Sequence, residues 1–125
     1  MKYIIMFLIV LGLAFSDFIT GYIKACCTGT PSSKKMRIGG LHKIAELTIM
    51  ATAIGLTIGL DMLGRYYNNT QLSDIAGLAT AFSIFSYITL MEIISILENF
   101  AEIVPEAEWA RQILRRTKNI ETKEE

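Results

Sequence analysis

Three long apolar runs dominate the chain, separated by short polar segments and followed by a charged tail. The runs cover about residues 3–25, 41–63 and 74–97, and each is long enough for a helix to cross the hydrocarbon core of a bilayer. A soluble domain of this length would need a polar face on most of its helices, and these runs lack one. The pattern therefore predicts an all-α membrane protein with three transmembrane helices.

A short amphipathic helix is expected after the third run. Pro105 suits a first helical turn, and the acidic residues that follow it precede the basic ones, as the helix dipole favours. Trp109 and Ile113 lie four residues apart, so this helix could lie on the membrane surface or pack on a neighbouring helix. We expect a transmembrane domain over residues 1–100 and a charged tail with this helix over residues 101–125.

Two connections are predicted between the runs. Residues 26–40 are expected to form a loop, because Pro31 and the Gly39-Gly40 pair break regular structure. Residues 64–73 are expected to form a polar turn, with Ser73 as the N-cap of the third helix.

The first run also has features of a secretory signal peptide. Lys2 precedes the apolar stretch, and Ala14-Phe15-Ser16 is a passable cleavage site. The apolar character continues past that site through Ile23, which a cleaved segment would not need. The pattern favours a retained helix, with cleavage as the alternative.

Polar residues recur at helical spacing inside the apolar runs. Asp17 shares one helical face with Thr20, Gly21 and Lys24, and a second face joins Glu92, Ser95 and Asn99. A carboxylate inside an apolar run is costly in hydrocarbon unless it faces protein or water. Glu46 of the second run is a further acid of this kind. The predicted polar membrane face therefore consists of Asp17, Thr20, Glu46, Glu92, Ser95 and Asn99.

Acids on all three helices have two explanations. They are protonated or paired inside a helix bundle, with Lys24, His42 and Lys43 as candidate partners, or they line a polar surface that only an oligomer encloses. Three short helices are not expected to bury three acidic faces and also surround a pore by themselves, so we expect a homo-oligomer. Small residues let helices approach closely. The expected packing positions are Gly21, Ala51, Gly55 and Gly59, the last three forming one seam between copies.

The distribution of basic residues predicts the orientation. The chain has 12 basic and 12 acidic residues, so no basic excess suggests a nucleic-acid partner. One side of a three-crossing arrangement holds two basic residues, Lys2 and Arg65, and the other holds the remaining ten. By the positive-inside rule the N-terminus is outside and the tail is cytoplasmic. The basic residues expected at the membrane surface are Lys34, Lys35, Arg37, Lys43, Arg111, Arg115 and Arg116.

No catalytic chemistry is apparent in the sequence. It has one histidine, no glycine-rich phosphate loop and no cluster with metal-ligand spacing. Cys26 and Cys27 are adjacent, which disfavours a disulfide between them. We therefore expect neither an enzyme nor a cofactor.

Two blocks of the sequence carry a family resemblance. Residues 92–99 (Glu-Ile-Ile-Ser-Ile-Leu-Glu-Asn) and 17–21 (Asp-Phe-Ile-Thr-Gly), with Gly39-Gly40-Leu41, Asp61 and Pro105, resemble the toxin-secretion/phage-lysis holin family along nearly the whole chain. The chain departs from that family's pattern at Met36, where glycine is common. It departs again at Ile103-Val104, where a glycine usually precedes the proline.

The resemblance implies a function. Such proteins accumulate in the bacterial inner membrane and assemble into lesions through which a cell-wall hydrolase, or in some relatives a toxin, leaves the cytoplasm. The residues themselves leave two alternatives open: a non-lytic membrane adaptor that binds another complex through the same polar faces, and a specific export channel that does not cause lysis.

Overall fold

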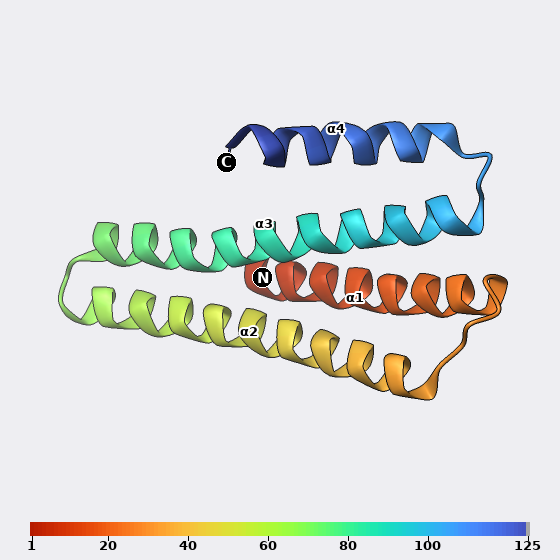
Figure 1. The fold of residues 1–125 in the computed structure, drawn as a ribbon. Helices are drawn as coiled ribbons and strands as arrows, with labels where there is room; N and C mark the ends of the chain where they lie inside the picture. The colour runs from red at the N-terminus through yellow and green to blue at the C-terminus, as the bar shows by residue number, and fades with distance from the viewer. Residues whose placement is uncertain (125) are drawn as a thin grey trace.

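The computed structural model describes residues 1–124, with side chains at all of these positions except 70, 72, 76, 78 and 121–124. It contains four helices: α1 (Lys2–Cys27), α2 (Ser33–Tyr66), α3 (Thr70–Ile103) and α4 (Glu108–Glu124). Helix α3 contacts each of the other three, and α4 contacts α3 alone within the described part of the chain. Figure 1 shows α1 and α2 along one side of α3 and α4 along the other.

The outer surface of the bundle is apolar. Each of α1, α2 and α3 is long and apolar enough to cross a membrane, yet only 17% to 22% of an apolar stretch of 18 residues in each is buried. Large apolar side chains such as Leu8, Leu56 and Leu90 point outward instead. In water this exposed surface would be unfavourable, whereas lipid covers it without cost. The predicted fold class, three transmembrane helices followed by a C-terminal helix, is confirmed.

One residue from each membrane-spanning helix forms the apolar core. Val10, Met50 and Ile88 are buried together, and half-buried apolar side chains surround them. This layer sets the helices in register, because it places the first half of α1 beside the middle of α2 and of α3. The hairpin of α2 and α3 extends beyond the N-terminus of α1 at the opposite end from the α1–α2 connection (Figure 1).

A glycine and a threonine hold α2 and α3 close together in their hairpin, and the hydropathy pattern of the sequence predicts neither role. The buried Thr57 hydroxyl lies 2.8 Å from the carbonyl oxygen of Ala53 and 2.9 Å from that of Gly77. A β-carbon added at Gly77 would lie 2.8 Å from Thr57 Cγ2. The helices therefore approach each other only because residue 77 has no side chain.

Gly77→Leu is expected to destabilise the bundle by about 1–3 kcal/mol, because the new side chain must displace Thr57 or separate the two helices. Thermal unfolding in detergent micelles measures the effect. Gly12→Leu is the matched control, since a β-carbon at Gly12 has no neighbour within 4 Å. Equal stability of the two variants would show that the Thr57–Gly77 approach is not required.

The predicted loop over residues 26–40 is wrong at both ends. Helix α1 continues to Cys27 and α2 begins at Ser33, so five residues connect them. Within this connection Gly29 takes a positive φ of 70°, which glycine adopts readily. The Ser32 side chain accepts a hydrogen bond of 3.5 Å from the Lys35 amide and caps α2.

The Gly39-Gly40 pair lies inside α2 rather than in a loop. Glycine lowers helix stability by about 1 kcal/mol, a cost that tertiary packing can offset. A β-carbon at Gly40 would lie 3.9 Å from Phe18 of α1, so this position faces the neighbouring helix.

All three transmembrane helices are longer than the apolar runs that predicted them. Asn69, rather than Ser73, is the N-cap of α3, and Asn68 takes a positive φ of 53° in the hairpin turn. With 34 residues each, α2 and α3 are about 51 Å long, against a hydrocarbon core of about 30 Å. Hydropathy identifies only the part of a helix that lipid surrounds, so it does not predict the polar turns at the helix ends.

Helix α4 packs on α3. Ala101 of α3 is buried against Ala107 and Ala110. The Phe100 and Trp109 rings have centroids 5.6 Å apart. Pro105 lies in the turn before α4 and not in its first helical turn. Of the two positions left open for this helix, the structure shows the packed one.

Candidate functional site: a polar cluster shared by three helices

Lys43 of α2 is the centre of a buried ion-pair cluster. Its ammonium lies 2.7 Å from Asp17 Oδ2 of α1 and forms an ion pair with Glu92 Oε1 of α3. Glu46 Oε2, one turn further along α2, is 3.5 Å away. One ammonium group thus contacts carboxyl groups from all three membrane-spanning helices. It holds them together where each carboxyl alone would be costly to place in lipid.

The cluster is well buried but incompletely paired. Glu92 is only 1% exposed, and Asp17 is also buried. Glu92 Oε2 is buried without a hydrogen-bond partner among the described residues, and Glu46 Oε2 likewise makes no hydrogen bond there. Three carboxyl groups share one lysine, so the cluster depends on that lysine: losing it would leave buried acids without any cation.

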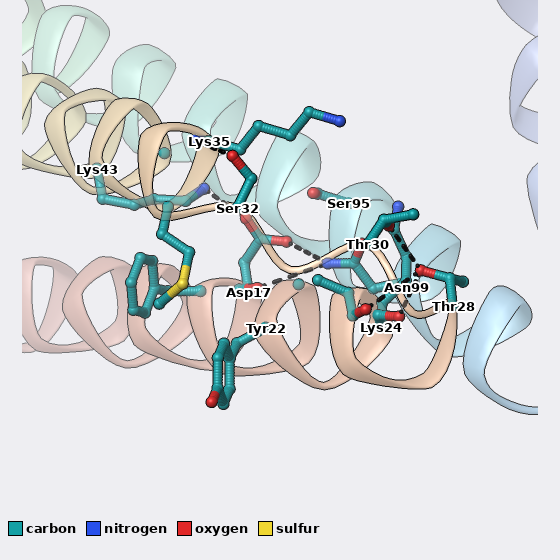
Figure 2. A pocket seen from close by; sticks show the side chains of 15 residues that line it. Asp17, Tyr22, Lys24, Thr28, Thr30, Ser32, Lys35, Lys43, Ser95 and Asn99 are labelled. Atoms are coloured by element: carbon teal, nitrogen blue, oxygen red, sulfur yellow. Dashed lines mark hydrogen bonds and ion pairs between the residues drawn. The ribbon is translucent and has the colours of Figure 1, made fainter.

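Asn99 of α3 extends the cluster toward the end of α1. Its side-chain amide donates to Asp17 Oδ1 and to Thr20 Oγ1, each at 3.1 Å (Figure 2). Gly21 faces this amide, since a β-carbon there would lie 3.6 Å from the Asn99 amide nitrogen, an ordinary van der Waals distance. The amide therefore orients the carboxyl group that Lys43 contacts from the other side.

Asn99→Ala is expected to destabilise the bundle by about 1–3 kcal/mol, because Asp17 Oδ1 loses its donor while it stays buried. Chemical unfolding in detergent micelles measures this change. Ser95→Ala is the matched control one turn earlier on the same face, since the Ser95 side chain lines the cavity and makes no hydrogen bond to the described residues. If Asn99→Ala lowers the stability of the bundle no more than Ser95→Ala does, the hydrogen bond from the Asn99 amide to Asp17 does not stabilise the bundle.

A cavity leads from one end of the bundle to this cluster. It has a volume of about 380 Å³ and lies between α1, the α1–α2 connection, the start of α2 and the last turns of α3. The buried Asp17 and Asn99 line it together with Lys43, Lys24 and the exposed Lys35 (Figure 2). The arrangement gives water a route to the buried acids from this end, which we call the basic end of the bundle.

The structure places the predicted polar face as follows. Asp17, Thr20, Glu92 and Asn99 join one network, Glu46 lies at its margin, and Ser95 lines the cavity. Of the candidate partners, Lys43 lies in the cluster. Lys24 instead pairs with Glu102 at 3.4 Å, and His42 is exposed. Among the described residues no group of side chains is suited to hold a metal ion.

Of the two explanations for the acids, the structure shows pairing inside a helix bundle. Lys43 pairs with Asp17 and Glu92 inside a single chain. The acids of the three helices do not form three separate faces, because all of them lie near one lysine. Homo-oligomerisation is therefore not required to hide these carboxyl groups, and it must be argued from the outer surface.

The small-residue seam lies on that outer surface. Ala51, Gly55 and Gly59 are exposed, and a β-carbon at either glycine would have no neighbour within 4 Å. The opposite face of α2, with Met50 and Thr57, is the one that packs inside the chain. The predicted helix contact at Ala51, Gly55 and Gly59 is thus not made within one chain.

The predicted surface lysines and arginines are exposed, with the exception of the half-buried Lys43. They form two groups, one on the first turns of α2 and one on α4. The exposed members are Lys34, Lys35, Arg37, Arg111, Arg115 and Arg116.

Three apolar helices that face outward and enclose an ion-pair cluster define a multi-pass membrane protein. Residues 1–119 match the model of the bacteriophage holin family. The chain therefore belongs to this family, and the resemblance drawn from its sequence blocks is confirmed. No curated protein and no solved structure is similar enough to the chain to count as a match.

Proposed function

We propose that this protein forms homo-oligomeric lesions in the inner membrane of a bacterium. Through these lesions a cell-wall hydrolase, or a toxin, leaves the cytoplasm, and the moment of assembly times lysis. The observation that carries the proposal is membership of the holin family along residues 1–119. That family is non-enzymatic, which agrees with a role in opening the membrane rather than in catalysis.

The basic end of the bundle faces the cytoplasm in this proposal, and the N-terminus lies outside. Lys24, Lys34, Lys35 and Arg37 gather at the basic end, whereas Lys2 and Arg65 are the basic residues on the opposite side. This asymmetry supports the orientation through the positive-inside rule. Anionic lipid of the inner leaflet attracts the same residues.

The two natural cysteines test the orientation. Cys26 and Cys27 are exposed at the basic end, so a membrane-impermeant maleimide added to intact cells should leave both unlabelled. The same reagent should label both in inside-out vesicles. Labelling in intact cells at the level of a Tyr3→Cys control, made in a chain with serine at positions 26 and 27, would overturn the orientation.

Assembly proceeds through the outward face of α2. A chain with its acids paired internally is stable in lipid as a single copy, and Ala51, Gly55 and Gly59 offer a surface on which a second helix can approach closely. Small assemblies keep the polar cluster enclosed. A sufficiently large one turns the cavity side, with Asp17 and Asn99, toward water, and the membrane opens there.

Co-expression with a cell-wall hydrolase that lacks an export signal tests the function. Induction of both proteins should depolarise the cells and lyse them, and the hydrolase alone should leave them intact. An adaptor subunit would leave the membrane potential unchanged. An export channel would release the hydrolase from cells that stay polarised. Either of these two results would contradict the proposal.

A further inference from the structure

Helix α4 lies alongside the part of α3 that belongs in the membrane. It runs back along α3 over much the same stretch of the bundle as α1 (Figure 1). Leu114 and Thr117 line one groove together with Met91 and Ile94 of α3. These α3 residues flank Glu92, which pairs with Lys43 inside the bundle. The second half of α4 therefore reaches the depth of the buried cluster.

Helix α4 carries too many charged residues to face lipid at the depth of the buried cluster. Arg111, Arg115 and Arg116 are exposed on its outer side, in a helix of 17 residues. If lipid surrounded α3 at Met91 and Ile94, these guanidinium groups would face hydrocarbon, where charged side chains are strongly disfavoured. The packed position is thus compatible with water, and not lipid, at this face of α3.

The contact between α3 and α4 buries few large side chains completely. Near the turn its fully buried side chains are small, with Ala101 against Ala107 and Ala110, and the larger side chains around them, Phe100 among them, are only half-buried. Further along, Lys118 pairs with Glu98 at 3.5 Å, and these side chains are 68% and 44% exposed. An exposed ion pair of this kind contributes little. Residues 104–107 separate the two helices and provide a place for the angle to change.

We propose that α4 leaves α3 when the chain is embedded in a bilayer, and that it then lies on the anionic lipid surface beside the basic end. There the arginines contact headgroup phosphates, and Trp109 and Ile113, which are both exposed in the packed position, enter the headgroup layer. On this proposal, α4 packs on α3 only in a state in which water, rather than lipid, contacts the outer face of α3.

Two matched cysteine pairs test this proposal in a chain with serine at positions 26 and 27. Glu98→Cys with Lys118→Cys replaces the α3–α4 ion pair, and Lys24→Cys with Glu102→Cys replaces an α1–α3 ion pair of similar length, 3.4 Å. Both are reconstituted in sealed vesicles of phosphatidylcholine and phosphatidylglycerol and treated with a short bis-maleimide. Single-cysteine variants confirm that each thiol reacts with a monofunctional maleimide.

The α3–α4 pair is expected to crosslink within the chain about fivefold less than the α1–α3 pair, because α4 no longer lies beside α3. Adding Arg115→Gln and Arg116→Gln should raise its yield, since the helix then loses the charges that exclude it from lipid. Equal crosslinking of the two pairs in sealed vesicles would overturn the proposal. An unchanged low yield in the glutamine variant would overturn the electrostatic cause assigned to it.

Discussion

Lys43→Met is expected to destabilise the folded bundle by about 3–5 kcal/mol, the cost of removing one partner from a buried ion pair. The ammonium of Lys43 contacts Asp17, Glu46 and Glu92, and it is the cation of the cluster. Without it, three carboxyl groups from three helices remain close together with no cation between them. We expect lower amounts of the protein in membranes and a lower unfolding midpoint in detergent micelles.

Lys24→Met is the matched control for this variant. Lys24 also forms an interhelical ion pair, with Glu102, but its partner side chain is 56% exposed. An exposed pair contributes about 1 kcal/mol or less, so this variant should stay close to the wild type. If Lys24→Met and Lys43→Met lost similar amounts of stability, burial of the cluster would not explain the cost of Lys43→Met.

A compensating change separates electrostatics from packing. If the cost of Lys43→Met comes from uncompensated carboxyl groups, adding Asp17→Asn and Glu92→Gln should restore part of the lost stability, because neutral amides are less costly to bury than carboxylates. The triple variant should unfold at a midpoint between those of Lys43→Met and the wild type. A further loss of stability would indicate that the lysine stem, and not its charge, matters most.

Gly55→Leu and Gly59→Leu are expected to block assembly and delay lysis, each at least about twofold, because a bulky side chain keeps two helix backbones apart at a small-residue interface. Both positions have open space in the single chain, so the bundle itself should fold normally. Lysis time after induction and oligomer size in chemically crosslinked membranes measure the effect.

Gly12→Leu serves as the control for these variants. Gly12 is another exposed glycine with open space around it, but it lies on α1, outside the proposed seam. It should leave lysis time and oligomer size unchanged. If the α2 variants also behave like the wild type, the copies associate through a different surface.

The sequence predicts the helices of this protein better than their ends. Long apolar runs identify three membrane-crossing helices because lipid imposes a minimum apolar length. The same criterion ends each helix where polarity rises, and so it misses the first turns of α2 around Gly39-Gly40. These turns are helical because Ser32 caps α2 and Gly40 packs toward Phe18 of α1.

The residues of the polar cluster could be predicted from the sequence, but the ion pairs between helices could not. Helical spacing places Asp17 beside Thr20, and Glu92 beside Asn99, because residues three, four or seven apart share a face. Spacing within one helix carries no information on which lysine from another helix lies opposite. Lys43 could be named only as one of three candidates, since its position depends on the register set by Val10, Met50 and Ile88.

Release of a folded protein from vesicles tests the central claim most directly. The purified chain is reconstituted in anionic vesicles that contain a folded fluorescent protein, and the account predicts that this cargo escapes above a threshold density of the chain. The Gly55→Leu variant, inserted to the same extent, should retain it. Vesicles that hold their cargo while the wild-type chain is fully inserted at high density would contradict the claim that this chain alone opens the membrane.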